Sequence, residues 1–390
     1  MSPMPESRQP VSAVLFRGAR KLDAAGQIDN FWMLVRGDTI VETGTGPGPV
    51  DRADQTVEVG GHWLVPGFLD LHGHGGGGFS YDNGPHGIRG AVATHRAHGT
   101  TRSLISLVAN PLATLEESLA DIAQLAAVDP LILGSHLEGP YLAVAARGAH
   151  NAAFLREPQP AEIERLLDAA RGTLRQITIA PELPNALDAI GVLLEEGVVV
   201  AIGHTEADFD TAREAFHIGA RILTHAFNAM PGIHHRAPGP VIAAFDDPTV
   251  ILELILDGLH VNPRVAALAF KSAPGRIALV TDAMAAAGST DGDYALGTLN
   301  VTVADGLATL RGTNTIAGST LTQDVALRIA IEDADVAPRD AVAALTLTPA
   351  RALGIEARHG LLTAGRVADA VILDSHWAVQ QVWANGAQLS

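Results

Sequence analysis

The chain has 390 residues, no cysteine, and 43 Asp and Glu against 26 Lys and Arg. The lack of cysteine excludes disulfides, thiolate metal ligands and a cysteine nucleophile. The formal charge of −17 argues against a nucleic-acid partner, because phosphates are bound by clustered Lys and Arg. The opening segment predicts no signal peptide and no stretch reaches the ~20 apolar residues of a membrane span, so we expect a soluble cytoplasmic protein with no membrane partner.

The two ends of the chain both predict β structure. Residues 11–64 contain β-like stretches separated by Asp, Gly and Pro turns, and the last thirty residues return to the same pattern. Neither end has enough strands to bury a face by itself. We therefore expect residues 1–64 and 359–390 to pair into one small β-sandwich.

Between these ends, eight short apolar stretches predict the strands of a barrel. Most are followed by helix-like segments, such as 111–128, 160–172 and 205–219, whose apolar residues recur every three or four positions. The strands are apolar on both faces, as in a parallel sheet that helices cover. The predicted fold class is α/β, with a (β/α)8 TIM barrel over residues 65–358. Its expected strands are residues 66–71, 101–108, 131–137, 176–180, 197–203, 221–225, 250–256 and 277–281.

Several of these strands end on a residue that can bind a metal or carry a proton. The carboxyl ends of barrel strands meet at one rim, so these side chains are predicted to converge. With 16 histidines and no cysteine, nitrogen and oxygen donors must hold any metal, and we expect a divalent ion. Zinc is the first expectation, with iron, manganese and cobalt as alternatives. The residues concerned are His72, His74, Glu138, His204, His225 and Asp282.

The two carboxylates at the strand ends have different predicted roles. Glu138 can bind one metal or bridge two, since Lys21 and Lys271 do not follow barrel strands and neither can supply a carboxylated bridging lysine. Asp282 is followed by small residues and has room to approach a water molecule. We expect it to act as the general base and acid, with a role as a further ligand as the alternative.

Two glycine-containing segments lie outside the barrel repeats. Residues 299–312 predict a hairpin that turns at Asp305 and Gly306. The Gly75 to Gly78 run predicts a mobile loop over the site.

The order of the motifs resembles the N-acetylglucosamine-6-phosphate deacetylases of the amidohydrolase superfamily over nearly the whole chain. The shared segments are PGFLDLHGHGG, HLEGPYL with RGAH, GHTEAD, THAFNAMPGIHHRAPG, DGLHVNP, VTDAM and IAGSTLT. An HxH pair with a late Asp is typical of the whole superfamily, whereas the NAMPG, DGLH and AGS segments are what point to the sugar-phosphate deacetylases.

The resemblance implies a role for each site residue. Glu138, His204 and His225 would bind the principal metal, Asp282 would be the acid and base, and His260 would polarise the acetamide carbonyl. Arg236 would meet the 6-phosphate, a role that suits a guanidinium group. The remaining residues implied to bind substrate are Ala149, His150, Asn228, Ala229, Asp257, Ile316, Ala317 and Gly318.

The resemblance also implies a second metal and a homodimer. Family members that keep both strand-one histidines hold two metals, and His72 and His74 are both present, so we expect a second site bridged by Glu138. His234 and His235 stand before Arg236, where the family usually has a small or polar residue, which leaves their contacts with phosphate open. A partner chain often helps to close the phosphate pocket in this family.

Two other functions remain compatible with the sequence. A different amidohydrolase, acting on N-acyl-amino acids or cyclic amides, would use the same metal rim with another pocket. A non-catalytic sugar-phosphate-binding regulator could keep the fold, but such a protein would not need Asp282. The predicted function is removal of the acetyl group from N-acetylglucosamine 6-phosphate to give glucosamine 6-phosphate and acetate, in amino-sugar metabolism.

Overall fold

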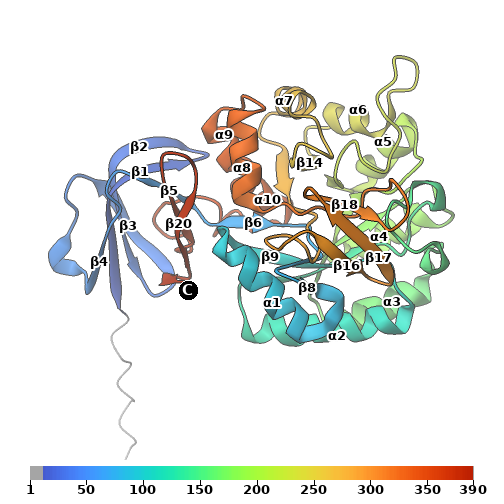
Figure 1. The fold of residues 1–390 in the computed structure, drawn as a ribbon, viewed down its shortest axis with the longest axis horizontal. Coiled ribbons are helices and arrows are strands. Elements are labelled where there is room, and N and C mark those ends of the chain that lie inside the picture. The colour runs from blue at the N-terminus through green and yellow to red at the C-terminus, as the bar shows by residue number, and fades with distance from the viewer. Residues whose placement is uncertain (1–11, 390) are drawn as a thin grey trace, which may run out of the picture.

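The computed structural model describes residues 12–389 and shows a small sheet domain beside a larger barrel (Figure 1). Residues 1–11 and 390 lie outside the described part. They include the start of the segment whose sequence predicts no signal peptide and the outer limits of the 1–64 and 359–390 segments.

Strands from both ends of the chain pair with each other, as the sequence predicts, and they form one eight-stranded sheet where the sequence predicts a small β-sandwich. Its order is β21-β20-β19-β5-β1-β2-β3, with β4 also paired to β1. The two ends are joined by the antiparallel pair β19 and β5, in which Val371 lies opposite Val65. Phe16, Met33 and Trp383 belong to the apolar core of this sheet. The strands are β1 (Ala13–Asp23), β2 (Gly26–Arg36), β3 (Thr39–Thr45), β4 (Gln55–Glu58), β5 (Trp63–Pro66), β19 (Ala370–Leu373), β20 (Val379–Ala384) and β21 (Ala387–Gln388).

The eight predicted barrel strands are all present and run parallel in chain order. The hydrogen-bonded path is β15-β14-β13-β12-β11-β10-β9-β6. Their bounds are β6 (Phe68–Asp70), β9 (Thr100–Leu107), β10 (Ile132–Glu138), β11 (Leu174–Ile179), β12 (Val199–Ile202), β13 (Ile222–Leu223), β14 (Ile251–Ile255) and β15 (Ile277–Val280). The transition from the terminal sheet to the barrel falls at Gly67, between β5 and β6. A Cβ atom at Gly67 would lie 2.3 Å from Thr101 Oγ1, so only glycine lets β6 start this close to β9.

Helices follow the strands and cover the outside of the barrel (Figure 1). The helix predicted over 205–219 begins later, at Phe209, because the Asp208 side chain accepts a hydrogen bond from Thr211 N and caps it there. The helices are α1 (Gly84–Ala97), α2 (Leu112–Val128), α3 (Pro160–Ala170), α4 (Ala186–Glu195), α5 (Phe209–Ile218), α6 (Gly239–Asp246), α7 (Pro263–Ser272), α8 (Gln323–Glu332), α9 (Pro338–Leu345) and α10 (Leu347–Ala352). Within residues 12–389, none of them is long and apolar enough to cross a membrane.

Contacts just beyond β6 and β15 close the barrel between its first and last strands. Thr281 Oγ1 donates to Asp70 Oδ2 at 2.7 Å, and the backbone N–H of Asp282 donates to His72 O at 2.8 Å. Gly73 and Ala283 form a parallel bridge. The closure therefore fixes the ends of β6 and β15, and with them His72, His74 and Asp282, against each other.

A three-stranded sheet follows β15, where the sequence predicts only a hairpin. β17 (Leu299–Ala304) and β18 (Leu307–Leu310) form the predicted hairpin, with Asp305 and Gly306 at positive φ in its turn. The unpredicted third strand is β16 (Gly292–Leu296), which has few buried residues to mark it. Leu296 packs with Val108 and Met284. The sheet thus extends the wall of the barrel mouth.

The Gly75 to Gly78 run forms a small hairpin of β7 (Gly75–Gly76) and β8 (Phe79–Ser80). A Cβ atom at Gly75 would lie 2.4 Å from Phe79 O and 3.0 Å from Ala285 N. The glycine there is explained by close packing. The predicted mobility of this segment stays a prediction.

A buried arginine joins the barrel to the terminal sheet and allows a stability test. Arg102 Nε lies 2.7 Å from Asp369 Oδ2, and Arg102 also donates to Asn385 Oδ1 at 2.6 Å. Arg102→Leu leaves the Asp369 carboxylate buried without its cation, so we expect the free energy of unfolding to fall by about 3–5 kcal/mol. Urea unfolding measures this change. Arg52→Leu, which breaks an exposed pair with Glu42, is the control and should cost less than ~1 kcal/mol; equal losses in both variants would contradict the prediction.

Candidate metal centre and active site

Six side chains from five strand ends converge at the carboxyl end of the barrel. The structure brings together all six residues that the sequence assigns to the metal centre and the acid–base role. Their ligand atoms form two groups, each with its atoms within 4.8 Å of one another, and Glu138 belongs to both groups. The groups are His72, His74, Glu138 and Asp282, and Glu138, His204 and His225.

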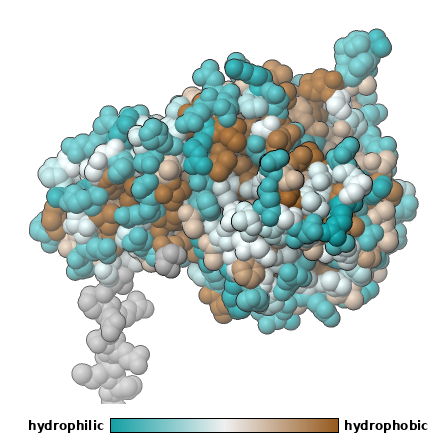
Figure 2. Space-filling view, in the orientation of Figure 1, coloured by the Kyte–Doolittle hydropathy of each residue, from teal (hydrophilic) through white to brown (hydrophobic). Residues whose placement is uncertain are grey.

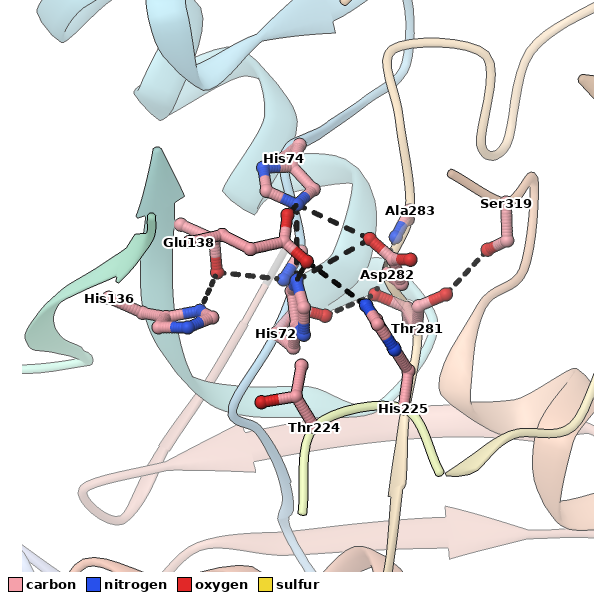
Figure 3. Close-up of polar contacts among 12 residues, drawn as sticks. His72, His74, His136, Glu138, Thr224, His225, Thr281, Asp282, Ala283 and Ser319 are labelled. Atoms are coloured by element: carbon pink, nitrogen blue, oxygen red, sulfur yellow. Dashed lines mark hydrogen bonds and ion pairs between the residues drawn. The ribbon is translucent and has the colours of Figure 1, made fainter. Parts of the chain in front are cut away.

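Glu138 lies at the centre of this arrangement. Figure 3 shows its carboxylate between the rings of His74 and His72, with the carboxylate of Asp282 beside them. Glu138 Oε1 lies 3.0 Å from His204 Nε2 and 3.1 Å from His225 Nε2. Its Oε2 lies 3.1 Å from His74 Nε2. One carboxylate therefore reaches both groups, which is the geometry that a bridging ligand requires.

The backbone at three of these strand ends turns in an uncommon way. His204, His225 and Asp282 have φ values of 47°, 26° and 45°, in the left-handed region that non-glycine residues rarely adopt. Each of these residues comes two positions after the last residue of its strand, which is Ile202, Leu223 or Val280. Such strain is typical of functional sites, where surrounding contacts hold the conformation.

The acidic and basic groups of the centre shift each other's pKa values. Burial opposes ionisation of Asp282, but the nearby His72 charge and a hydrogen bond from His74 outweigh it and lower the pKa of Asp282 to about 2. Burial also opposes protonation of His74, but hydrogen bonds to Asp282 and Glu138 raise the pKa of His74 to about 9. The pKa of Glu138 lies well below its usual value, because the charges of His72, His150 and His204 outweigh burial. Both carboxylates are therefore ionised at neutral pH.

The donor set fits a divalent cation. The Nε2 atoms of His204 and His225 face each other at 3.0 Å, and those of His72 and His74 at 3.2 Å. Two ring nitrogens this close need a proton or a cation near them, because their lone pairs repel. Imidazole and carboxylate donors without thiolates suit zinc, iron, manganese or cobalt.

A cavity of about 260 Å³ opens directly onto these donors. Asp282 and His260 both line it, together with Glu138, His204 and His225. Of the residues expected to bind substrate, those that line it are Ala149, His150, Asn228, Ala229, His260, Ile316 and Gly318. His150 also reaches the metal centre, since its Nε2 lies 3.3 Å from Glu138 Oε2.

Three residues expected at the substrate site do not line this cavity in the single chain. Ala317 is fully buried, between Ile316 and Gly318, which do line the cavity. Asp257 instead holds His260, with its Oδ2 2.7 Å from His260 Nδ1. Arg236 is exposed and lies with His234 and His235 on the loop between β13 and α6, where its Nη1 is 2.7 Å from His235 Nε2. This loop projects from the barrel as a hydrophilic extension (Figures 1 and 2).

Two buried polar residues beneath the centre were not predicted from the sequence. His136 lies between Ser106 Oγ and Thr178 Oγ1, at 2.9 Å from each. Glu253 lies 3.3 Å from His72 Nδ1. The signal that could have found Glu253 is a charged residue inside the otherwise apolar stretch ILELIL.

Comparison with known proteins assigns the chain to a family. The profile of the amidohydrolase family matches residues 63–388, which is most of the chain. The chain belongs to the amidohydrolase family. This amidohydrolase therefore has the barrel that its strand pattern predicts, and its donor cluster lies at the rim where barrel enzymes place their sites.

The relatives of this amidohydrolase include sugar-phosphate deacetylases over nearly their full length. It is 37% identical to the N-acetylgalactosamine-6-phosphate deacetylase of Escherichia coli O157:H7, over 95% of this chain and 98% of that protein. A mutant of the N-acetyl-D-glucosamine-6-phosphate deacetylase of Mycobacterium smegmatis, solved with N-acetyl-D-glucosamine-6-phosphate, is 40% identical with a TM-score of 0.91, covering 97% of this chain and 99% of that one. The N-acetylglucosamine-6-phosphate deacetylase of Pasteurella multocida has a TM-score of 0.92 at 27% identity. The match covers 96% of this chain and 99% of that one.

Proposed function

We propose that this amidohydrolase removes the acetyl group from a 2-acetamido sugar 6-phosphate, with N-acetylglucosamine 6-phosphate as the first substrate to test. The observation that carries the proposal is that one cavity is lined by the candidate metal donors, by ionised Asp282 and by His260, whose ring is hydrogen-bonded to Asp257. Relatives named as 6-phosphate deacetylases, at 37% and 40% identity, support this substrate class.

The proposed mechanism assigns each step to a residue at the cavity. A divalent cation held by Glu138, His204 and His225 would supply Lewis-acid polarisation of the amide carbonyl and of the attacking water. Asp282 accepts the proton from that water as it adds to the carbonyl carbon, and later delivers the proton to the sugar nitrogen as the C–N bond breaks. His260 donates from Nε2 to the developing oxyanion. The products are the amino sugar 6-phosphate and acetate.

We also propose that His72 and His74 would help to hold a second cation, with Glu138 as a ligand common to both donor groups. The second donor group and the position of Glu138 in both groups support this assignment. Metal analysis of purified protein tests it through the number of ions bound per chain.

We further propose that the enzyme is a homodimer in the cytoplasm. A sugar phosphate is charged and does not cross a bilayer unaided, so its hydrolase belongs where the substrate is made. Arg236 lies outside the cavity of its own chain, so its proposed contact with phosphate requires loop movement or a second copy. Exposed apolar side chains on consecutive segments, Ile233, Leu259 and Leu268, offer a surface for that copy. Light scattering on the protein as it elutes from a size-exclusion column measures its molar mass, which distinguishes a dimer from a single chain.

The function is tested by acetate release from a panel of sugars. The panel contains N-acetylglucosamine 6-phosphate, its galacto epimer and both sugars without phosphate, since relatives are named for either epimer. We expect turnover to depend strongly on the phosphate, and the Asp282→Asn protein controls for contaminating activity. No turnover of either phosphosugar by the metal-loaded enzyme would overturn the proposal and direct the search to N-acyl-amino acids and cyclic amides.

The pH profile tests the role of His260. Burial opposes its protonation, but a hydrogen bond to Asp257 and the Asp257 charge outweigh it and raise the pKa of His260. The protonated form therefore persists to higher pH and is lost as the pH rises through this raised pKa. We expect Asp257→Asn to move the alkaline limb of kcat/KM to lower pH, and His260→Gln to cost roughly 10²–10³ in kcat. An alkaline limb that does not move would contradict this role.

A further inference from the structure

One carboxylate below the metal centre has no role in the proposed mechanism. Glu253 lies in the middle of β14 (Ile251–Ile255), where all five residues are buried, and the side chain itself has no exposed surface. An ionised carboxylate in such a position costs several kcal/mol unless it is paired. Its partners therefore explain why it is there.

Glu253 is paired with a residue of the metal centre. Its Oε2 lies 3.3 Å from His72 Nδ1, and its Oε1 accepts a hydrogen bond from Gln176 Nε2 at 2.8 Å. Oε2 also accepts a hydrogen bond from the backbone N–H of His225 at 3.4 Å. Within residues 12–389, the ion pair formed by Glu253 is with His72 and not with a lysine or arginine.

The other ring nitrogen of His72 points toward the donor cluster. His72 Nε2 lies 3.2 Å from His74 Nε2, 3.3 Å from Glu138 Oε1 and 3.5 Å from Asp282 Oδ1. A neutral imidazole carries a proton on one nitrogen and a lone pair on the other, and a carboxylate at Nδ1 selects the form with the proton there. The lone pair of His72 Nε2 then faces the other members of its donor group, which are His74, Glu138 and Asp282.

The four histidines of the centre differ in what holds their outer nitrogen. His204 Nδ1 lies 2.9 Å from the carbonyl oxygen of Ala146. The Nδ1 atoms of His74 and His225 are buried and find no hydrogen-bond partner among the described residues. His72 is the one held by a carboxylate, an outer partner that orients a histidine ligand and raises its basicity.

We propose that Glu253 is a positioning residue that holds His72 with its Nδ1 protonated, so that occupancy of the second metal site depends on Glu253. This inference rests on the two-cation centre proposed above. Glu253 also adds a third carboxylate to Glu138 and Asp282 around the His72 ring, and this negative charge favours a second dication.

The test measures metal binding to Glu253→Gln, which keeps the side-chain shape and removes the charge. Chelator-stripped protein is titrated with Zn²⁺ and, separately, Mn²⁺ by calorimetry, and bound metal is counted by mass spectrometry. We expect the affinity for the second cation to fall about 10- to 100-fold and the affinity for the first to stay unchanged. Thr178→Val is the control, because Thr178 lies in the same buried layer and contacts His136 and Thr224 instead of the proposed ligands.

A double-mutant cycle separates positioning from a general structural effect. If Glu253 acts through His72, Glu253→Gln has no further effect on metal affinity in a His72→Asn background. An equal loss in both backgrounds, or an unchanged second affinity in the single variant, would overturn the inference. If the Glu253→Gln protein does not fold, the double variant Glu253→Met with Gln176→Met is used in its place in the same cycle. This double variant removes the Glu253 charge together with the Gln176 amide that donates to it.

The outcomes also distinguish this inference from the proposed function. An unchanged affinity for the second cation in Glu253→Gln contradicts the role of Glu253 alone. A wild-type chain that binds one cation contradicts both the second site and the role of Glu253, and leaves deacetylation to be judged from acetate release.

Discussion

Replacing Asp282 with asparagine is expected to lower kcat roughly 10²- to 10⁴-fold, the range that a general acid–base group contributes. The carboxylate of Asp282 lines the cavity and its pKa is lowered to about 2 by His72 and His74 in spite of burial. It is therefore ionised and able to accept a proton at neutral pH, whereas the asparagine amide cannot. The measurement is the steady-state rate of acetate release.

The same variant separates loss of chemistry from loss of metal. Glu138, His204 and His225 form a donor group without Asp282, so we expect Asp282→Asn to keep the cation at that group. Metal analysis and thermal unfolding of the variant check this. A rate within about tenfold of the wild type, well short of the 10²-fold lower limit, would remove Asp282 from the acid–base role.

Replacing Glu138 with glutamine is expected to have the largest effect on metal binding. The Glu138 carboxylate lies within 3.3 Å of ring nitrogens of five histidines, which are His72, His74, His150, His204 and His225. It belongs to both donor groups, so its charge acts at both sites. We expect metal affinity at each to fall by more than the roughly 100-fold that removal of an outer partner of a ligand can cost, and activity to fall with it.

Metal content and activity are measured on the same preparation of Glu138→Gln. Glu42→Gln is the control for handling, because Glu42 is half exposed, lies on β3 of the terminal sheet outside the barrel, and pairs with Arg52. Retention of the wild-type metal content by Glu138→Gln would show that Glu138 does not bridge the two groups.

Much of the fold could be predicted because the relevant signals are local. The strands before His204 and Asp282 are apolar on both faces, which occurs when helices cover a parallel sheet. Eight such stretches, separated by helical patterns, leave few architectures other than a barrel. The third strand of the sheet after β15 was missed, because β16 is mostly exposed and its apolar residues do not alternate.

The convergence of the candidate metal donors could be predicted for a similar reason. His72, Glu138, His204, His225 and Asp282 each follow or end a predicted strand, and parallel strands of a barrel bring such ends to one rim. Side-chain contacts between residues that do not lie at strand ends could not be predicted in this way. Asp257, expected at the substrate, contacts His260 instead.

The sequence by itself thus determined the barrel and the strand-end side chains that converge at its rim, since both follow from the order of apolar strands and the residues that come after them. Only the tertiary structure decided which groups pair below and beside the site. The contact of Glu253 with His72 joins residues 181 positions apart, and the position of Arg236 outside the cavity depends on the path of a long loop. Such pairings arise from the closure and packing of the barrel, which no local pattern encodes.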